Sequence, residues 1–385
     1  MHPLIFALYP IKIAALQKLF VFLKGKERYP AMFELKEQLS AKNKDCLERL
    51  YRKVKGYAAL QNLQPGVCGS ARKEERIDWL ASMMARKEIL QSIVSDQRAG
   101  EAAYMSYVYE SGGFGEYVAR SPYWEETGLI YAVTDHEGAV HGVMTQELMA
   151  FLREGGAALM AQANAASFVN SAVCAMTNLY GAVSYAKAYD IFQEVAVLHR
   201  KIPYETFVET AVRFAQFRED SGIVTYQKNF VASEYLDVRV RSGIRRISPL
   251  PSYYELISKQ GDKPYFTDLS VRILLDYEFP GSCEPNVYIG EFTEFLCNTF
   301  GKHKTELSGI MGELCRACRE ERGINEIFGM LTDAGYAPPS QKAQKTMVRH
   351  IMEIKNNVRL RINRGYTINE MRGICYDANA ICSNL

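Results

Sequence analysis

The residues with the clearest metal-like spacing are two cysteines near the C-terminal third of the chain. Cys315 and Cys318 are three residues apart, and Cys297 and His303 precede them. A structural zinc ion takes four convergent thiolate or imidazole ligands, and two cysteines one helical turn apart supply only two of them. The pair also lies in phase with the apolar residues of a predicted helix, where a free cysteine packs as a small hydrophobe. We therefore interpret both as core residues and predict neither a metal site nor a cofactor.

Sequence patterns that mark common enzymes are missing from the chain. It has no Gly-x-x-x-x-Gly-Lys-Ser/Thr loop, no His-Glu-x-x-His, no Gly-x-Ser-x-Gly and no dinucleotide fingerprint after a predicted strand. Residues 112–115 are rich in glycine, but they follow a predicted helix and are typical of a helix terminator. We predict that the protein is not an enzyme. A minor alternative is an enzyme whose pocket is built from residues distant in the sequence.

Basic side chains offer a different chemistry, the binding of phosphates by Coulomb attraction and counterion release. Three groups could do this: Arg72, Lys73 and Arg76; Arg239, Arg241, Arg245 and Arg246; and Arg359, Arg361 and Arg364. Arg213 lies in the predicted helix 204–217, where it could reach a base edge. Glu205 and Glu209 of the same helix would repel phosphate. The favoured hypothesis is a non-catalytic, nucleic-acid-associated or regulatory protein that binds DNA or RNA, and the alternative is an adaptor that docks a partner protein.

Because the chain as a whole is almost neutral, any phosphate-binding surface must be a local cluster of basic residues. The 385 residues include 46 basic and 44 acidic side chains, a formal net charge of +2. Nine cysteines, an odd number spread along a long chain, are typical of reduced thiols in the cytoplasm. The apolar stretch 2–25 is interrupted by Pro10, Lys12 and Lys18, which favours a buried helix over a membrane anchor. We expect a cytoplasmic protein without a membrane segment.

The elements that must position these groups are predicted to be mainly α-helical. N-terminal helices occupy 1–44, and a helix-loop-helix module with a first winged-helix-like unit occupies 45–155. Its wing is a β-hairpin over 128–143, where β-prone residues flank a turn. A second winged-helix-like unit spans 156–236, with its hairpin at 222–231. Residues 237–266, punctuated by proline and glycine, are predicted to be a linker, and 267–385 a helical domain.

The segment 345–373 has the strongest local signals in the chain. Apolar residues recur at three- and four-residue spacing from Met347 to Ile362, which predicts an amphipathic helix with arginines on its opposite face. Gly365 can adopt the left-handed conformation that closes a helix. Thr367 and Glu370 have the spacing of a capping box that opens the next helix. The segment therefore predicts a tight helix-glycine-helix corner.

Three stretches together resemble a known group of proteins. They are Gly-Ser-Ala-Arg-Lys-Glu-Glu-Arg-Ile at 69–77, Asn-Leu-Tyr-Gly-Ala-Val-Ser at 178–184, and the corner at 356–370. The chain is similar to uncharacterised, mainly Firmicute proteins that combine a Rho N-terminal-like, SAP-like helix-loop-helix, winged-helix elements and a helical C-terminal region, related to SEC-C-motif proteins. Cys375 and Cys382 lack the Cys-x-Cys spacing of the SEC-C zinc motif, so that site is not expected. The resemblance implies the fold more than an activity.

Overall fold

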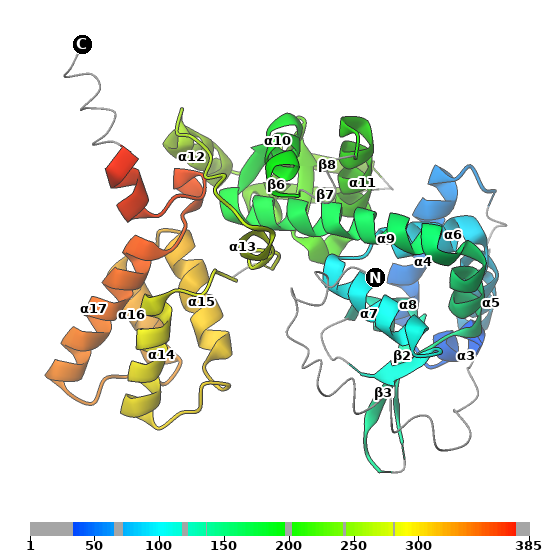
Figure 1. Ribbon diagram of the computed structural model, residues 1–385, viewed down its shortest axis with the longest axis horizontal. Coiled ribbons are helices and arrows are strands. Elements are labelled where there is room, and N and C mark those ends of the chain that lie inside the picture. The colour runs from blue at the N-terminus through cyan, green and yellow to red at the C-terminus, as the bar shows by residue number, and fades with distance from the viewer. Residues whose placement is uncertain are drawn as a thin grey trace. The chain divides into compact units, whose positions relative to one another are not determined.

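The structure is a computed structural model that describes residues 34–64, 72–117, 122–135, 137–196, 202–241, 244–279 and 282–374. The chain divides into two compact units, Met1–Asn170 and Ser171–Leu385. Both units are mainly helical with small antiparallel sheets, as predicted (Figure 1). The apolar helix predicted within 2–25 lies outside the described residues. Among the described helices, none combines the length and the apolarity needed to cross a bilayer.

The first unit combines a group of helices with one three-stranded sheet. The helices are α3 (Leu35–Ser40), α4 (Lys44–Leu60), α5 (Lys73–Met84), α6 (Lys87–Ser95), α7 (Ala99–Glu110), α8 (Pro122–Thr127) and the start of α9 (Gln146–Tyr180). Strands β2 (Ile130–Thr134) and β3 (Val140–Met144) form the predicted hairpin, with Tyr131 opposite Val143. A third strand that was not predicted, β1 (Phe114–Glu116), pairs with β3. Gly112 and Gly113, with φ of 81° and 94°, turn the chain from α7 into β1 instead of only ending the helix.

Buried polar groups of the first unit are joined by hydrogen bonds. The Tyr57 hydroxyl lies 2.7 Å from a carboxylate oxygen of Asp96, and the Trp124 indole nitrogen donates to the Glu101 carbonyl at 2.9 Å. Because a buried polar group without a partner costs free energy, these bonds favour one packing of the helices. α9 continues from this unit into the second, and its helical geometry is interrupted at Gly156, where φ is 56° and ψ is −151°.

The second unit begins with a sheet framed by helices. After α9 come β4 (Ala182–Ser184), α10 (Tyr185–Val195), α11 (Tyr204–Phe217), β5 (Ile223–Tyr226) and β6 (Asn229–Ala232), and the strand order is β4-β6-β5. The β5–β6 hairpin was predicted, and its turn residues Gln227 and Lys228 both have positive φ, as a tight two-residue hairpin requires. β4 was not predicted, because a three-residue strand has too few residues to show alternation.

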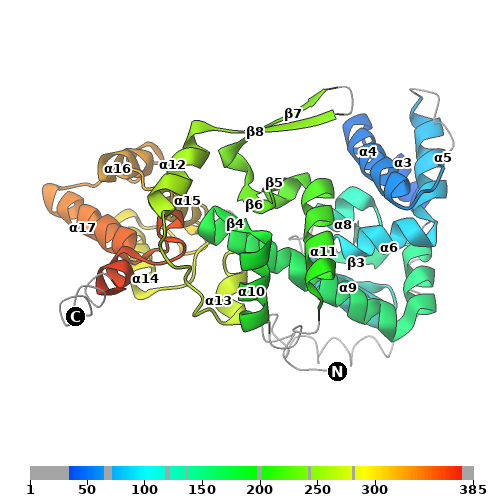
Figure 2. The same cartoon turned by 90° about the horizontal axis from the view of Figure 1, so that it is seen from above.

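The linker predicted at 237–266 is wrong, because this segment is folded. β7 (Leu236–Arg241) and β8 (Ile244–Pro249) pair as an antiparallel hairpin, and α12 (Pro251–Gln260) follows. Figure 2 shows the two strands as a long ribbon leading into α12. Leu236, Val238 and Val240 alternate with charged residues along β7, a pattern typical of a half-buried strand. Pro251 lies in the first turn of α12, where proline opens a helix instead of breaking it.

The C-terminal part is helical, as predicted. α13 (Val271–Leu275) is followed by α14 (Val287–Phe300), α15 (Ser308–Arg319), α16 (Ile324–Asp333) and α17 (Gln341–Asn357). The last four enclose one apolar core that includes Phe292, Leu314 and Ile351. Cys318 belongs to this core and Cys315 is buried, so the prediction that both are packed inside the protein is confirmed.

The predicted corner at 345–373 has a different shape from the one expected. α17 buries Met347, Ile351 and Ile354, as the apolar stripe predicts, but it ends at Asn357. The chain is then extended at Val358 and makes one 3-10 turn, η4 (Arg361–Asn363), before Gly365 at φ 88°. The capping box is confirmed, because Thr367 N donates to Glu370 and Glu370 N donates to the Thr367 hydroxyl at 3.1 Å. Residues 368–374 are helical.

Candidate nucleic-acid interface

The β7–β8 hairpin carries most of its apolar residues on one face and the facing pair Arg239 and Arg246 on the other, while Arg245, opposite Val240, lies on the mainly apolar face. Val238 lies opposite Ile247 and, one position along, Arg239 lies opposite Arg246. Since side chains alternate across a strand, the two pairs occupy opposite faces. Leu236, Val238 and Ile247 pack into an apolar cluster with Val231 and other residues of the β4-β6-β5 sheet and α12. The other face is left for charge.

On that outer face, two arginines oppose each other with one carboxylate nearby. The Arg239 side chain is 80% exposed, and one of its terminal nitrogens lies 2.7 Å from the Asp237 carboxylate. Like charges directly opposite on a sheet destabilise it, and Asp237 offsets part of that repulsion. Arg246 on this face and Arg245 on the opposite face are both exposed, and neither has a hydrogen-bond or ion-pair partner among the described residues. Their guanidinium groups can therefore receive oxyanions without first breaking an internal contact. The side chain of Arg241, the fourth predicted arginine, lies outside the described residues.

Arg361 holds the start of this hairpin in place. Its side chain is only 5% exposed, and Nε donates to the Asn178 carbonyl at 2.9 Å. A terminal nitrogen pairs with Glu234 and lies 3.4 Å from the Tyr235 hydroxyl. Glu234 and Tyr235 immediately precede β7. The buried guanidinium therefore fixes the point where the chain enters the hairpin.

The point where the chain leaves the hairpin is fixed by backbone groups and by Gln260. Leu250 N, just after β8, donates to the Tyr235 carbonyl at 3.0 Å. Gln260, the last residue of α12, donates to the carbonyls of Tyr180 at 2.7 Å and Arg361 at 2.8 Å. Both ends of the hairpin are thus joined to the same corner, and the strands extend from a fixed base.

Two other arginines predicted to bind nucleic acid, Arg359 and Arg364, are used inside the protein. Arg359 is buried, with Nε 3.0 Å from Glu284 and a terminal nitrogen 2.9 Å from Glu370. Its guanidinium carbon lies 3.6 Å from the centre of the Phe266 ring. Arg364 is half-buried and donates to the Gly261 carbonyl at 2.7 Å. These bonds occupy the donors that a phosphate would need, so the expectation of an exposed basic face here is wrong.

The basic group of the first unit, Arg72, Lys73 and Arg76, is also largely engaged. Arg76 pairs with Glu48 at 2.7 Å and its side chain is 14% exposed. Lys73 is exposed and donates to the Ser40 carbonyl at 2.9 Å. Arg72 is exposed at the start of α5 and also has an interaction within the protein. These contacts join α5 to α3 and α4 and occupy donors of the basic group, although the bond to the Ser40 carbonyl leaves the charge of Lys73 in place.

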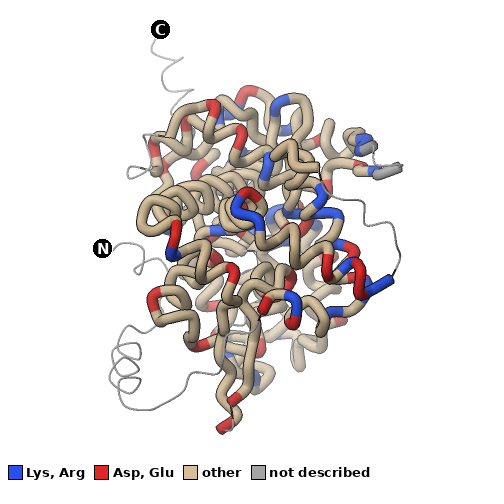
Figure 3. Tube along the Cα trace, turned by 90° about the vertical axis from the view of Figure 1, so that its right-hand side faces the viewer, with Lys and Arg blue, Asp and Glu red and all other residues tan. Residues whose placement is uncertain are grey.

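The predicted base-reading helix is a poor match for a polyanion. Arg213 of α11 is half-buried and interacts within the protein, whereas Glu205 and Glu209 are exposed on the same helix. Acidic and basic residues are also interspersed along the rest of the trace in Figure 3. Of the predicted basic groups, the β7–β8 hairpin is therefore the strongest candidate for binding a polyanion. The alternation of Val238 and Val240 with the arginines was the sequence signal that could have placed this group on a strand.

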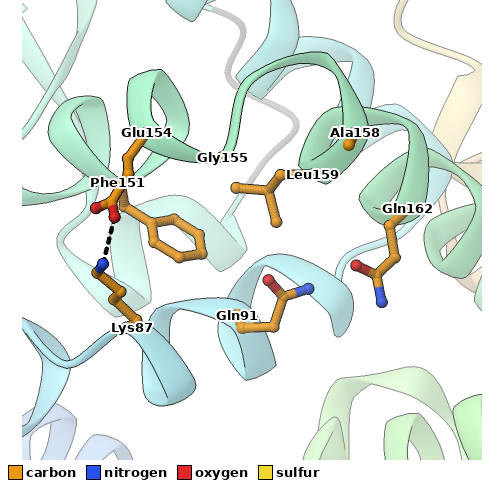
Figure 4. Close-up of a pocket in the computed structure, with 8 residues that line it drawn as sticks. All are labelled: Lys87, Gln91, Phe151, Glu154, Gly155, Ala158, Leu159 and Gln162. Carbon is orange, nitrogen blue, oxygen red and sulfur yellow. Dashed lines mark hydrogen bonds and ion pairs between the residues drawn. The ribbon is translucent and has the colours of Figure 1, made fainter.

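A small pocket in the first unit was considered as a rival site. Its volume is about 310 Å³, at the lower end for ligand pockets, and it lies where α9 is interrupted beside Gly155 (Figure 4). Phe151 and Leu159 form its apolar walls, and its charged groups, Lys87 and Glu154, pair with each other. The remaining polar side chains are glutamines. This lining offers no activated nucleophile or acid–base pair.

A second rival is a set of possible metal ligands between α14 and α17. Ligand atoms of Glu291, His350 and Glu353 lie within 4.8 Å of one another. Burial, followed by the nearby charge of Arg349, lowers the pKa of His350, which favours the neutral imidazole that metals bind. The set supplies three of the four ligands that zinc usually takes, and Glu291 is exposed. It is weaker than the hairpin as a basis for function.

No family model matches the chain, and neither a curated protein nor a solved structure matches it.

Proposed function

We propose that this protein is a non-catalytic nucleic-acid-binding protein whose contact surface is the β7–β8 hairpin. The observation that carries the proposal is the outer face on which Arg239 and Arg246 oppose each other with only Asp237 as a compensating carboxylate, while the exposed Arg245 adds a third cation on the opposite face of the same ribbon. A phosphate between these guanidinium groups would relieve their repulsion and take charge-assisted hydrogen bonds from them. Binding would then depend strongly on salt.

The element order supports a winged-helix-like scaffold for the hairpin. A helix, a short strand, two helices and a two-stranded hairpin follow one another as α9, β4, α10, α11, β5 and β6, and β4 closes the sheet by pairing with β6. This is the order expected for a winged helix. The first unit has the same strand order, β1-β3-β2, but within its described residues only α8 lies between β1 and β2. The proposed relation to Firmicute proteins with such units rests on the same features.

In this proposal the hairpin takes the place of the usual recognition helix. Exposed Glu205 and Glu209 on α11 would face the phosphates if that helix entered a groove, and each would oppose binding. A two-stranded ribbon is narrow enough to enter the major groove or to follow a single strand. Arginine can donate to phosphates and, in the major groove, to O6 and N7 of guanine, so the exposed arginines of the hairpin offer donors for both kinds of contact.

A protein adaptor is the second candidate function. α12 follows the hairpin directly and exposes Tyr254 and Ile257, which are three residues apart and so lie on one side of the helix. An apolar pair next to free arginines suits a partner with an acidic and apolar surface. On this alternative, Tyr254→Ala would abolish partner capture and the chain would show no salt-dependent binding to nucleic acid.

Fluorescence anisotropy with labelled 20-nucleotide single-stranded DNA, its duplex and the matching RNA tests the proposal. If the three exposed arginines Arg239, Arg245 and Arg246 each contact a phosphate, the slope of log K against log salt should be about −3 for duplex DNA, and Arg245→Glu with Arg246→Glu should reduce its size by about 2. The matched control is Lys342→Glu with Lys345→Glu, which changes the net charge equally at exposed positions of α17. Equal losses in both double variants, or no binding by the wild type at 50 mM salt, would refute a hairpin site.

A further inference from the structure

Two cysteines of the second unit lie in direct contact. Cys283 is in the connection between α13 and α14, and Cys315 is in α15. Their sulfur atoms are 2.7 Å apart. A disulfide has an S–S distance of about 2.05 Å, so the two sulfurs would have to approach by only about 0.7 Å to form one. The contact joins positions that are 32 residues apart in the sequence.

A buried arginine lies one helical turn beyond this pair. Arg319 of α15 is 2% exposed, and none of its three guanidinium nitrogens has a hydrogen-bond partner among the described residues. Its guanidinium carbon is 5.5 Å from the centre of the Tyr277 ring. A cation buried in this way needs a negative charge or a π face close by, since the loss of its hydration is costly. Tyr277 supplies only the π face.

The cysteine pair can supply the missing negative charge. The hydrogen bond from the Cys315 thiol lowers the pKa of Cys283 below that of an ordinary cysteine, and the charge of Arg319 lowers it further. The same contact and burial raise the pKa of Cys315 well above the ordinary value. The shared proton therefore remains on Cys315 and the thiolate forms at Cys283. Cys283 is half-buried and Cys315 is buried, so Cys283 is the more accessible of the two.

We propose that Cys283 and Cys315 form an oxidation site for small hydroperoxides, with Cys283 as the attacking residue and Cys315 as the resolving residue. The Cys283 thiolate attacks one peroxide oxygen, so that an S–O bond forms, the O–O bond breaks and hydroxide leaves. Cys315 then attacks the sulfenic sulfur, the S–S bond forms, and the hydroxyl group leaves as water with the Cys315 proton. Two thiols are oxidised, and one hydrogen peroxide becomes two waters once the hydroxide is protonated.

The reaction is tested on the full chain with hydrogen peroxide as the oxidant. After one equivalent of peroxide and alkylation of the remaining thiols, peptide mass spectrometry under non-reducing conditions should show the Cys283–Cys315 link as the first product. The link should be absent from Cys283→Ser and Cys315→Ser. It should persist in the control Cys297→Ser, which changes a half-buried cysteine of α14 that has no cysteine partner among the described residues. Oxidation of other cysteines while 283 and 315 stay reduced would overturn the proposal.

The role of Arg319 has its own readout, the pH dependence of Cys283 alkylation by iodoacetamide. Arg319→Met should move the midpoint of that profile to higher pH and slow peroxide consumption at neutral pH, while Arg319→Lys should keep the wild-type midpoint. If the methionine variant unfolds, the lysine variant and a Cys315→Ala variant still test the assignment, because alanine has no hydrogen-bond donor and loss of the Cys315 hydrogen bond should raise the same midpoint. A midpoint that is identical in wild type and Cys315→Ala contradicts the proposed thiolate.

Discussion

Arg361→Met should destabilise the second unit, because this side chain joins α9 to the base of the β7–β8 hairpin. The charged hydrogen bond from Nε to the Asn178 carbonyl is buried and worth about 1.5–3 kcal/mol. The pair with Glu234 adds at most about 1 kcal/mol, since the Glu234 side chain is 46% exposed and can be rehydrated. The sum is about 2–4 kcal/mol. For a unit of roughly 200 residues, this corresponds to a fall in melting temperature of roughly 5–15 °C.

Differential scanning calorimetry of the full chain measures this effect. Arg246→Met is the matched control, because it removes an exposed hairpin arginine that has no partner among the described residues and should leave the melting temperature unchanged. Glu234→Gln should change the melting temperature only slightly, because water can replace the lost ion pair at this exposed side chain. A melting temperature of Arg361→Met within 1 °C of the wild type, or an equal fall in Arg246→Met, would refute the reasoning. If the proposed function is correct, Arg361→Met should also weaken binding while the salt slope stays near the wild-type value, because every hairpin arginine is still present.

Two further perturbations test local parts of the fold. The hydrogen bond from His141 holds the pKa of Asp135 below its ordinary value, so this carboxylate stabilises the β2–β3 hairpin above about pH 4 and the contribution is lost as pH falls through the lowered pKa. The difference in melting temperature between wild type and Asp135→Asn should therefore be largest at pH 6 and should shrink steadily as the pH is lowered below about 4. Gly365→Ala should lower the free energy of unfolding, measured in urea, by about 1–3 kcal/mol, since φ is 88° and the new methyl group would lie 2.8 Å from the Tyr180 ring. The control Gly373→Ala should not lower it, because an added methyl group there would have nothing within 4 Å.

Features fixed by neighbouring residues were the ones that the sequence predicted well. The β2–β3 and β5–β6 hairpins, the apolar stripe of α17 and the capping box of Thr367 and Glu370 all depend on residues within one or two turns of each other. Strands β1 and β4 were missed because each has three residues and pairs with a strand well separated in the sequence. Pairing of that kind is decided by the fold and leaves almost no local pattern.

Residue spacing could not predict which arginine side chains are buried and which are exposed. Helical periodicity placed Arg359 and Arg361 opposite the apolar stripe, but the helix ends at Asn357 and both side chains turn inward. Their partners come from distant segments: Glu284 for Arg359, and Asn178 and Glu234 for Arg361. If α17 had continued past Asn357, each added helical residue would have contributed only a few tenths of a kcal/mol. The hydrogen bonds and ion pairs that Arg359 and Arg361 make with these distant partners contribute more.

A nearly neutral chain can still present a cationic surface when its carboxylates are used unevenly. Around the corner, Glu234, Glu284 and Glu370 are drawn to Arg361 and Arg359, which are buried and would otherwise lack counter-charges. The hairpin has only Asp237, and that carboxylate contacts Arg239. The positive charges of Arg245 and Arg246 therefore have no carboxylate partner among the residues that the structure describes. The acidic residues at the base of the hairpin are already paired with Arg359 and Arg361, and Asp237 contacts Arg239. Arg361, which the sequence suggested as a phosphate ligand, thus holds the hairpin that exposes Arg245 and Arg246. A charge reversal at Arg245 and Arg246 should weaken binding without lowering stability, because it also removes the repulsion between Arg246 and Arg239.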